Sequence, residues 1–205
     1  MASLVHIVDD DPLIRASVSF LLSSHGYATE IYASGTELIA EGRLERGCIL
    51  LDLSMPGMSG HEVQEELTRR GINLPVIVIS GRGDLDAAVP AMKLGAVDFL
   101  QKPVRDADLL AAVEGALDSF EKSDERQRAK LAALAALRRL SARERQILRG
   151  LLGGLSNKEI ARRLGLSPRT VEMHRASMMN DLAVSSLSEA VRIAIDAELE
   201  PLEET

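Results

Sequence analysis

The sequence contains little cysteine and few aromatic residues. Among its 205 residues there is one cysteine and no tryptophan, and aromatic residues make up only 2%. A single cysteine excludes a disulfide framework and a cysteine-based metal site. The apolar content of 46% is ample for a packed core, which must consist mainly of aliphatic residues and methionine. Cys48 lies within an apolar run, so we interpret it as a buried core residue.

Long apolar runs are absent as well. None approaches the roughly 20 residues that a helix needs to cross a bilayer. The chain begins with a predicted strand instead of a basic segment followed by an apolar stretch. We therefore expect a soluble, cytoplasmic protein without membrane contact. A nucleotide-binding loop of the GxxxxGK type is also missing, so we expect no turnover of a separate substrate and do not predict an enzyme.

Charge is distributed unevenly along the chain. Residues 1–120 carry 9 Lys and Arg against 18 Asp and Glu, a net charge of −9. Residues 121–205 carry 15 against 13, a net charge of +2, and within 141–195 the balance is 9 against 5, or +4. An acidic front half and a basic block behind it predict two domains with different partners. The modest positive charge of the second suits phosphate backbones.

The first 120 residues alternate between strand-like and helix-like patterns. Apolar, β-rich segments fall at 4–8, 27–32, 47–51, 75–79 and 97–100. Helical patterns separate or follow them at 12–25, 35–41, 59–70, 84–94 and 106–120. Five strand and helix units of this kind predict a parallel, doubly wound sheet. Right-handed crossovers would bring the ends of strands one, three, four and five to one edge.

Acidic residues follow two of these strands. Asp9 and Asp10 come directly after the first, and Asp52 closes the third. The carboxyl ends of parallel strands carry the ligand sites of open α/β folds, and acids gathered there repel each other unless a cation binds them. Ligation by oxygen alone suits Mg²⁺ best. The pattern therefore predicts a magnesium site and a reactive aspartate, while Asp11 before Pro12 is interpreted as a helix cap.

A strand-end aspartate beside a cation can attack phosphorus and hold a phosphoryl group as an acyl phosphate. Such a transfer also needs positive or hydrogen-bonding groups on the other side of the phosphorus. Lys102 follows the fifth strand and Ser80 ends the fourth, so both are candidates to bind phosphoryl oxygens. The alternatives are a solvated surface lysine and an ordinary turn serine.

The second part of the chain is helical throughout. Residues 121–140 lack glycine and proline and predict a helical linker, which either continues the preceding helix or restarts near Ser123. Its leucine stripe consists of Leu131, Leu134 and Leu137. This stripe either forms a dimer interface or packs against one of the two domains. Four short helices are predicted at 141–152, 156–164, 168–182 and 187–198. The last six residues are expected to be frayed. We therefore divide the chain into domains at 1–120 and 141–205.

Two of these short helices, joined by residues 164–167, fit a helix-turn-helix. In such motifs the second helix enters the major groove of DNA, with its N-terminal part at the base edges. The residues of this helix that can face outward are Arg169, Glu172, Met173, Arg175 and Ala176. Side chains that could meet phosphates or fix the helix position are Lys158, Arg162, Arg163, Arg169 and His174. The alternative is a four-helix packing module with solvated charges.

The front half resembles a known family. Its passages VHIVDDD, LLDLSMPGMSG, VIVISGRGD and GAVDFLQKP resemble the receiver domain of two-component response regulators, in particular the FixJ-like subfamily. The resemblance covers residues 1–120 and implies a flavodoxin-like fold. It also implies that Asp52 accepts a phosphoryl group from a histidine kinase or a small acyl phosphate.

The same resemblance implies roles for the surrounding residues. Mg²⁺ would be bound by Asp9 (partly through water), Asp10, Asp52 and the backbone carbonyl of Ser54. Ser80 and Lys102 would bind the phosphoryl oxygens, with Ser80 moving toward the phosphate while Phe99 turns inward. A cis peptide before Pro103 is also implied, and X–Pro bonds tolerate that isomer.

Residues 140–200 resemble the LuxR-type helix-turn-helix, and NKEIA, SPRTVE and the His-Arg pair are its most specific parts. By that resemblance the five outward-facing residues form the recognition face, and Glu172 would accept a hydrogen bond from cytosine N4. The chain departs from the family at Asn180 and Asp181, where many members have a basic residue. The departure removes an expected phosphate contact.

Together the two resemblances imply a transcription factor that phosphorylation activates. The phosphorylated receiver would form a homodimer through the surface from about Asp84 to Gln101, and the dimer would bind two half-sites of double-stranded promoter DNA. The implied partners are a cognate histidine kinase and DNA, with RNA polymerase as a further candidate. The alternative is a phosphate sink or protein-interaction switch whose helical domain does not bind DNA.

Overall fold

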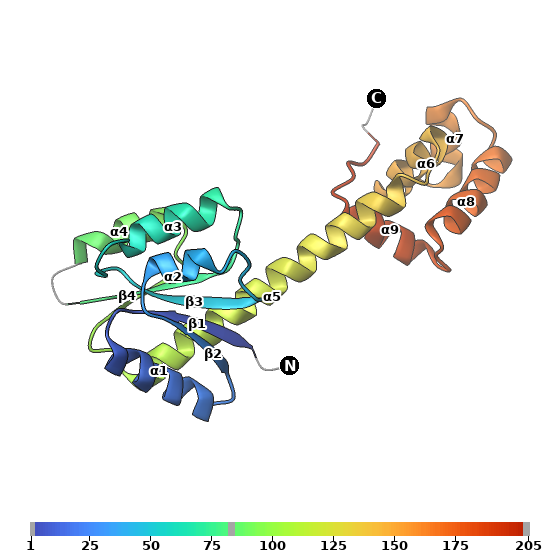
Figure 1. Ribbon diagram of the computed structural model, residues 1–205. Helices are drawn as coiled ribbons and strands as arrows, with labels where there is room; N and C mark the ends of the chain where they lie inside the picture. Colours follow the sequence, from blue (N-terminus) through green and yellow to red (C-terminus); the bar gives the residue numbers. More distant parts are fainter. Residues whose placement is uncertain (1–2, 82–84, 203–205) are drawn as a thin grey trace. The chain divides into compact units, whose positions relative to one another are not determined.

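The computed structural model describes residues 3–81 and 85–202, and of 85–87 it describes the backbone alone. The chain forms two compact units, Met1–Lys122 and Ser123–Thr205 (Figure 1). Strands and helices alternate in the first unit and the second is helical, which confirms the predicted fold class. Within the described ranges, no helix combines the length and the apolar character that a membrane span requires.

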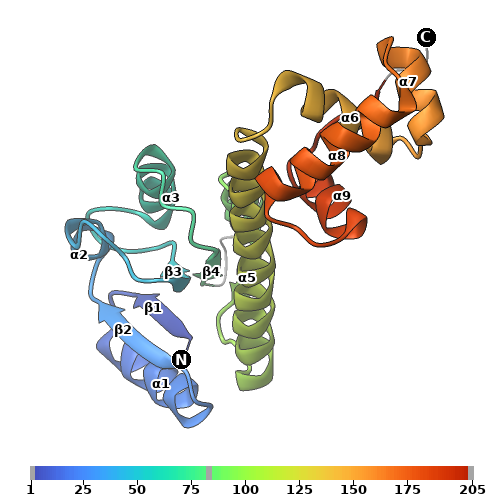
Figure 2. The same ribbon diagram turned by 90° about the vertical axis from the view of Figure 1, so that its right-hand side faces the viewer.

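A five-stranded parallel sheet forms the centre of the first unit, in the order β2-β1-β3-β4-β5. Its strands are β1 (Leu4–Val8), β2 (Ala28–Tyr32), β3 (Gly47–Asp52), β4 (Val76–Ser80) and β5 (Asp98–Gln101). Figure 2 shows β1 beside β2 and β3. Every residue of β1, β3 and β4 is buried, as continuous apolar runs predict for strands covered on both faces. Cys48 is fully buried in β3, and burial raises the pKa of its thiol to about 12.

Helices cover the sheet in two layers (Figure 1). One face carries α1 (Pro12–Ser24) and the first part of α5 (Asp106–Leu137), and the other carries α2 (Gly35–Ala40), α3 (Gly60–Arg69) and α4 (Leu85–Lys93). Separate apolar clusters fill the two sides of the sheet. Since α1 and α3 lie on opposite faces, the winding reverses between the neighbouring strands β1 and β3. Ligands bind at such switch points in open α/β sheets.

Local sequence signals explain where these helices begin and end. The Asp11 side chain accepts a hydrogen bond from the Leu13 N–H at 2.8 Å and caps α1, as predicted. Gly26 then ends the helix region with a φ of 87°, a conformation that glycine adopts at little cost. The predicted bounds of the elements agree with the structure within about two residues, apart from the end of α5. Asp84, where one helix was expected to begin, lies outside the described residues.

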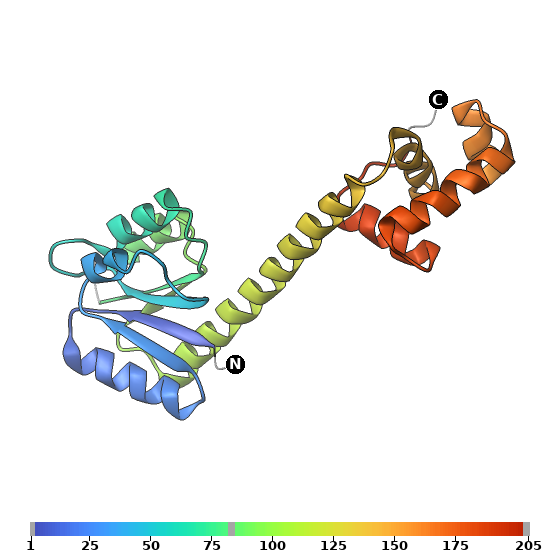
Figure 3. The same cartoon turned by 45° about the vertical axis from the view of Figure 1, so that its right-hand side comes forward.

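The last helix of the first unit does not end near residue 120. It continues as α5 to Leu137 without interruption (Figure 3), so the linker does not restart near Ser123. Its final turns join the core of the second unit through Ala133, Ala136 and Leu137. Leu131 and Leu134 are instead 58% and 38% exposed. The predicted leucine stripe is therefore not one continuous buried face, because small alanine side chains allow the closer packing.

The second unit packs four helices against the end of α5. They are α6 (Ala142–Leu152), α7 (Asn157–Leu164), α8 (Pro168–Leu182) and α9 (Leu187–Asp196). Reciprocal hydrogen bonds of Ser141 with Glu144 and of Ser156 with Glu159 cap α6 and α7, as their spacing predicts. Gly165 has a φ of 65° in the turn between α7 and α8, a conformation that allows a short connection to join the two helices.

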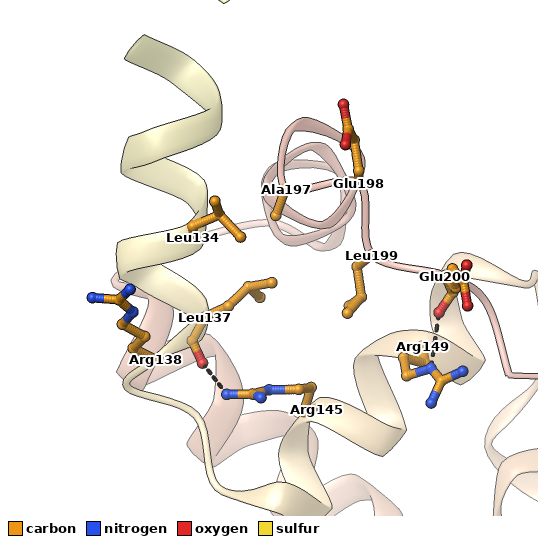
Figure 4. A pocket seen from close by; sticks show the side chains of 9 residues that line it. All are labelled: Leu134, Leu137, Arg138, Arg145, Arg149, Ala197, Glu198, Leu199 and Glu200. Atoms are coloured by element: carbon orange, nitrogen blue, oxygen red, sulfur yellow. Dashed lines mark hydrogen bonds between the residues drawn. The ribbon is translucent and has the colours of Figure 1, made fainter. Parts of the chain in front are cut away.

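The C-terminal segment is docked, and the expectation that it is frayed was wrong for the described residues up to Leu202. Arg149 donates from Nε to the Glu200 carbonyl at 2.9 Å and from Nη2 to the Pro201 carbonyl at 3.1 Å. The Leu202 N–H returns a hydrogen bond to the Arg149 carbonyl. A cavity of about 510 Å³ remains between this segment, α6 and the end of α5, with Leu134, Leu137 and Leu199 around it (Figure 4).

Candidate functional site

Three carboxylates gather at the carboxyl edge of the sheet. Asp9 and Asp10 follow β1, and Asp52 is the last residue of the neighbouring β3. One oxygen atom from each side chain lies within 4.8 Å of the others. Asp9 and Asp52 are buried, whereas Asp10 is exposed. A ligand would therefore reach the cluster from the side of Asp10.

Lys102 brings a positive charge to this cluster from the end of β5. Its Nζ lies 2.7 Å from Oδ2 of Asp9 and 2.8 Å from Oδ2 of Asp52. Burial of Lys102 disfavours its charged form, but the hydrogen bonds to Asp52 and Asp9 outweigh this effect and raise its pKa above the ordinary value. Lys102 is thus shared by two buried acids and is not a solvated surface lysine.

Other hydrogen bonds hold the carboxylates in place. Oδ1 of Asp9 accepts from the Asp11 N–H at 2.9 Å, and Oδ1 of Asp52 accepts from the Ser54 N–H at 3.2 Å. Arg15, one turn into α1, donates from Nη1 to the Asp9 carbonyl at 2.7 Å. Sequence reasoning missed Arg15, and its position in the helix directly after the acidic residues is the signal that could have found it.

Ser80 lies at the same edge of the sheet, and Phe99 lies within the neighbouring strand β5, where it pairs with Val78. Ser80 is the last residue of β4 and is fully buried, and its carbonyl accepts from the Lys102 N–H at 2.7 Å. Phe99 in β5 is half-buried and packs against the apolar cluster on the side of α3 and α4. The peptide bond between Lys102 and Pro103 is cis, as the resemblance implied. The structure thus brings together the residues expected to bind the phosphoryl group.

The donor set fits a hard divalent cation. The three carboxylates offer only oxygen ligands, which Mg²⁺ prefers, and their oxygens are close enough to share one ion. The Ser54 carbonyl follows Asp52 by two residues, at the start of the loop after β3. The residues present at this edge are therefore compatible with a magnesium site.

In the second unit, α7 and α8 form the predicted helix-turn-helix. Val171, Met178 and Leu182 of α8 are buried in the apolar clusters of the unit. The predicted recognition residues whose side chains are exposed are Arg169, Glu172, Met173 and Ala176. Of the predicted phosphate contacts outside that set, the exposed ones are Lys158 and Arg162, and the half-buried ones are Arg163 and His174. One face of α8 is thus available to a partner.

Arg175 does not share this exposed face, which corrects the expectation that it points outward. It is half-buried, and its Nη1 donates to Oδ1 of Asn157 at 2.6 Å. The physical reason is its spacing, four residues after Val171 and three before Met178, which places it on the buried stripe of α8. Its long side chain reaches from this stripe to the first residue of α7.

Glu144 is a buried acid whose wider role sequence reasoning missed. It is 5% exposed, and its carboxylate accepts from Ser141 N–H at 2.8 Å and Oγ at 2.6 Å. A further hydrogen bond comes from Ser177 on α8. The hydrogen bonds from Ser141 and Ser177, with His174 nearby, hold the pKa of Glu144 below its ordinary value. The cap of α6 is therefore also a contact to α8.

Known proteins share both parts of this chain. Residues 5–114 match the response regulator receiver domain family, and residues 138–194 match the bacterial regulatory proteins of the luxR family. The transcriptional regulatory protein FixJ of Azorhizobium caulinodans is 45% identical over 201 residues, which cover 98% of this chain and 95% of that protein.

Solved structures agree with this assignment over nearly the whole length. The response regulator StyR has a TM-score of 0.78 at 36% identity, and the match covers 95% of this chain and 99% of StyR. Full-length FixJ from B. japonicum has a TM-score of 0.62 at 39% identity, with 96% and 98% covered. The chain therefore belongs to the FixJ-like response regulators, phosphorylation-dependent transcriptional regulators that combine a receiver domain with a LuxR-type DNA-binding domain.

Proposed function

We propose that Asp52 is the phosphoacceptor of this regulator. The observation that carries the proposal is the position of its buried carboxylate at the end of β3, next to Asp9 and hydrogen-bonded to Lys102. A carboxylate oxygen so placed attacks phosphorus and forms an acyl phosphate. The bond between phosphorus and the donor atom breaks, and its electron pair stays with the donor.

The neighbouring residues have separate tasks in this transfer. Asp9, Asp10, Asp52 and the Ser54 carbonyl would hold Mg²⁺, which would supply positive charge to offset the charge of the transferring oxygens. Lys102 exchanges one of its two carboxylate partners for a phosphoryl oxygen. Ser80 is fully buried, so its side chain must move for the hydroxyl to reach the phosphoryl group. Phe99 turns inward at the same time. Phosphorylation in this way favours one of two conformations.

A histidine kinase is the proposed phosphoryl donor, and the surface beside the acceptor supports this partner. A groove of about 540 Å³ runs between α1 and the start of α5, and Ile14, Val18 and Pro103 are among the residues that line it. Leu13, which also lines the groove, is 78% exposed. An apolar groove that reaches Lys102 suits a kinase helix that must bring its phosphohistidine to Asp52.

A homodimer of phosphorylated receivers is proposed on the other side of the sheet. Val89 and Met92 of α4 and Val97 before β5 are 61%, 46% and 46% exposed. They fall within the expected surface from Asp84 to Gln101, of which Asp84 is outside the described residues. Exposed apolar side chains close to Phe99 in the chain favour association with a second copy once Phe99 has moved.

For the second unit we propose binding to double-stranded promoter DNA through α8. Its exposed residues Arg169, Glu172, Met173 and Ala176 would lie at base edges. Phosphate contacts are proposed for Lys158, Arg162, Arg163 and His174. RNA polymerase is a further proposed partner of the DNA-bound dimer. The proposed division of labour is a receiver at 1–120, a linker at 121–140 and a DNA-binding domain at 141–205.

The family is one of transcriptional regulators and not of enzymes. For this chain, self-phosphorylation at Asp52 is the one catalytic step that we propose. The proposed location is the cytoplasm, because the protein must meet chromosomal DNA and the phosphorylated kinase in the same compartment.

The experiment that tests the proposed function compares wild type with Asp52→Asn. Oligomeric state is measured by light scattering, and duplex binding is measured over a range of salt, both with Mg²⁺ and with or without beryllofluoride. We expect beryllofluoride to promote dimers and tighter DNA binding in wild type alone. Equal DNA binding in all samples would show that the acidic site does not gate the protein. Absence of duplex binding at every salt concentration would favour a phosphate sink.

A further inference from the structure

The hydrogen bond between Arg175 and Asn157 joins the two helices of the helix-turn-helix. Nη1 of Arg175 lies 2.6 Å from Oδ1 of Asn157, eighteen residues earlier in the chain, and both side chains are half-buried. Asn157 is the first residue of α7, directly after the capping Ser156. The guanidinium of Arg175 is thus held beside the start of α7.

This position differs from that of the base-reading residues. Exposed side chains of α8 such as Glu172 and Met173 lie on the opposite side from the buried Val171 and Met178. Arg175 starts from the buried stripe and extends toward α7. In a helix-turn-helix the second helix enters the major groove, whereas the first crosses the sugar-phosphate backbone. A group beside the start of α7 is therefore placed for a phosphate and not for a base.

The chemistry of the pair supports the same assignment. Asn157 is a neutral acceptor, so this hydrogen bond orients the guanidinium without neutralising its charge. A guanidinium has five N–H donors in a planar fork, and the bond to Asn157 uses one of the Nη1 donors. The fork matches a phosphate geometrically, and such charge-assisted bonds are stronger than neutral ones. By contrast, Arg105 and Arg128 are paired with aspartates in this chain.

We propose that Arg175 binds a DNA phosphate and that Asn157 is the residue that positions it. This inference rests on the proposed function, because it assumes that α8 enters the major groove. Arg175 then sets where α8 lies on the duplex and does not contribute to the choice of bases. Asn157 contributes through Arg175 alone, by holding the guanidinium in one orientation before DNA arrives.

The first test uses the full chain with Mg²⁺ and beryllofluoride, and a duplex that the wild-type protein selects from random-sequence DNA. Arg175→Ala should weaken binding to the selected duplex and to an unrelated duplex by a similar factor, about tenfold. It should also reduce the slope of log affinity against log salt by about one. Asn157→Ala should weaken binding by about threefold, and should add nothing in the Arg175→Ala background.

A second test locates the phosphate. Single phosphates of the selected duplex are replaced in turn by neutral methylphosphonates. One replacement should weaken wild-type binding and have no effect on Arg175→Ala, which would identify the partner phosphate. Arg143→Ala is the matched control, because Arg143 also donates to a neutral amide, Oε1 of Gln146 on its own helix at 3.0 Å. This variant should respond to the methylphosphonates as wild type does.

The outcomes separate this inference from the function on which it rests. One outcome would overturn the inference: Arg175→Ala changes the preferred base at one position, and no methylphosphonate replacement weakens wild type while leaving Arg175→Ala unaffected. Arg175 would then read a base. An effect of Asn157→Ala that persists in the Arg175→Ala background would overturn the positioning role. If wild type selects no sequence and binds no duplex, the proposed function fails and this inference fails with it.

Discussion

Lys102 and Asp52 form an ion pair across a strand that belongs to neither of them. Nζ of Lys102 lies 2.8 Å from Oδ2 of Asp52, yet β4 separates their strands β5 and β3 in the sheet. The lysine therefore leans over the end of β4, where Ser80 lies. In the proposed phosphorylation of Asp52, Lys102 would balance the charge of the carboxylate beforehand and would be available to the phosphoryl group afterwards.

Removal of Lys102 should lower the free energy of unfolding, and Mg²⁺ should reduce this loss. In Lys102→Ala, Asp9 and Asp52 remain buried without their shared cation, so we expect the free energy of unfolding to fall by about 3 kcal/mol in the absence of Mg²⁺. Addition of Mg²⁺ should recover part of this loss, because a bound divalent ion offsets the same charges. Denaturant unfolding with and without Mg²⁺ measures both values. An identical loss in the two conditions would contradict a shared site.

Gly60 should not tolerate a side chain. A Cβ at this position would lie 2.5 Å from the Asp52 carbonyl and 2.8 Å from Cα of Leu53, so α3 or the loop after β3 must shift. We expect Gly60→Ala to lower the free energy of unfolding by about 1 to 3 kcal/mol and to slow phosphorylation by a small acyl phosphate. Gly115→Ala in α5 is the control, because a Cβ there meets nothing within 4 Å. That variant should be stabilised by about 1 kcal/mol.

Leu13 and Met92 should distinguish the two proposed protein surfaces. Leu13→Ser should slow phosphoryl transfer from the kinase, because it removes apolar area from the groove beside α1, and leave dimerisation with beryllofluoride unchanged. Met92→Ser should weaken dimerisation with beryllofluoride and leave phosphoryl transfer from the kinase unchanged. Both should accept phosphoryl from a small acyl phosphate at the wild-type rate. Transfer kinetics and light scattering measure the two effects. If either variant impaired both processes, the surfaces would not be independent.

The contribution of Glu144 to stability should depend on pH. Its pKa in the folded protein is lowered from 4.5, so its stabilising effect is fully present above about pH 4.5 and is lost as the pH falls through the lower folded-state value. The difference in unfolding free energy between wild type and Glu144→Gln should therefore shrink on acidification through this range. Thermal unfolding at several pH values measures it.

Glu159→Gln is the matched control for Glu144→Gln. It alters the same reciprocal cap with Ser156, but Glu159 is exposed. Only Glu144→Gln should change the amide chemical shifts around Ser177 in α8, because only Glu144 bonds to that helix. Equal effects of the two variants on α8 would mean that Glu144 acts as a cap and nothing more.

Arg149 should hold the C-terminal segment in place. Arg149→Ala removes the hydrogen bonds to the Glu200 and Pro201 carbonyls, and we expect the free energy of unfolding of the second unit to fall by about 1 to 2 kcal/mol. Faster amide exchange at Leu202, whose N–H bonds to the Arg149 carbonyl, would show release of the segment. Unchanged exchange there would indicate that the apolar contacts of Leu199 and Leu202 suffice.

Local sequence patterns were sufficient to predict the helices and strands and to place three aspartates at one edge of the sheet. Five strands, of which β1, β3 and β4 are fully buried, and their helices could be predicted because periodicity, caps and helix-ending glycines act over a few residues. Asp9, Asp10 and Asp52 could be placed together because parallel strands joined by right-handed crossovers end at one edge. Lys102 and Ser80 could be proposed as their companions from their positions at the ends of the fifth and fourth strands, and the family resemblance added Phe99.

The positions of side chains whose packing partners are distant in the sequence could be seen only in the folded protein. Whether Leu131 and Leu134 or Ala133 and Ala136 pack inward depends on the surfaces that α6 and α9 offer. Arg175 turned to Asn157 because its long side chain has many rotamers, and packing against α7 selects one of them. Local patterns carry no information about such choices, since the competing arrangements have the same secondary structure and differ only in which neighbours folding brings within reach.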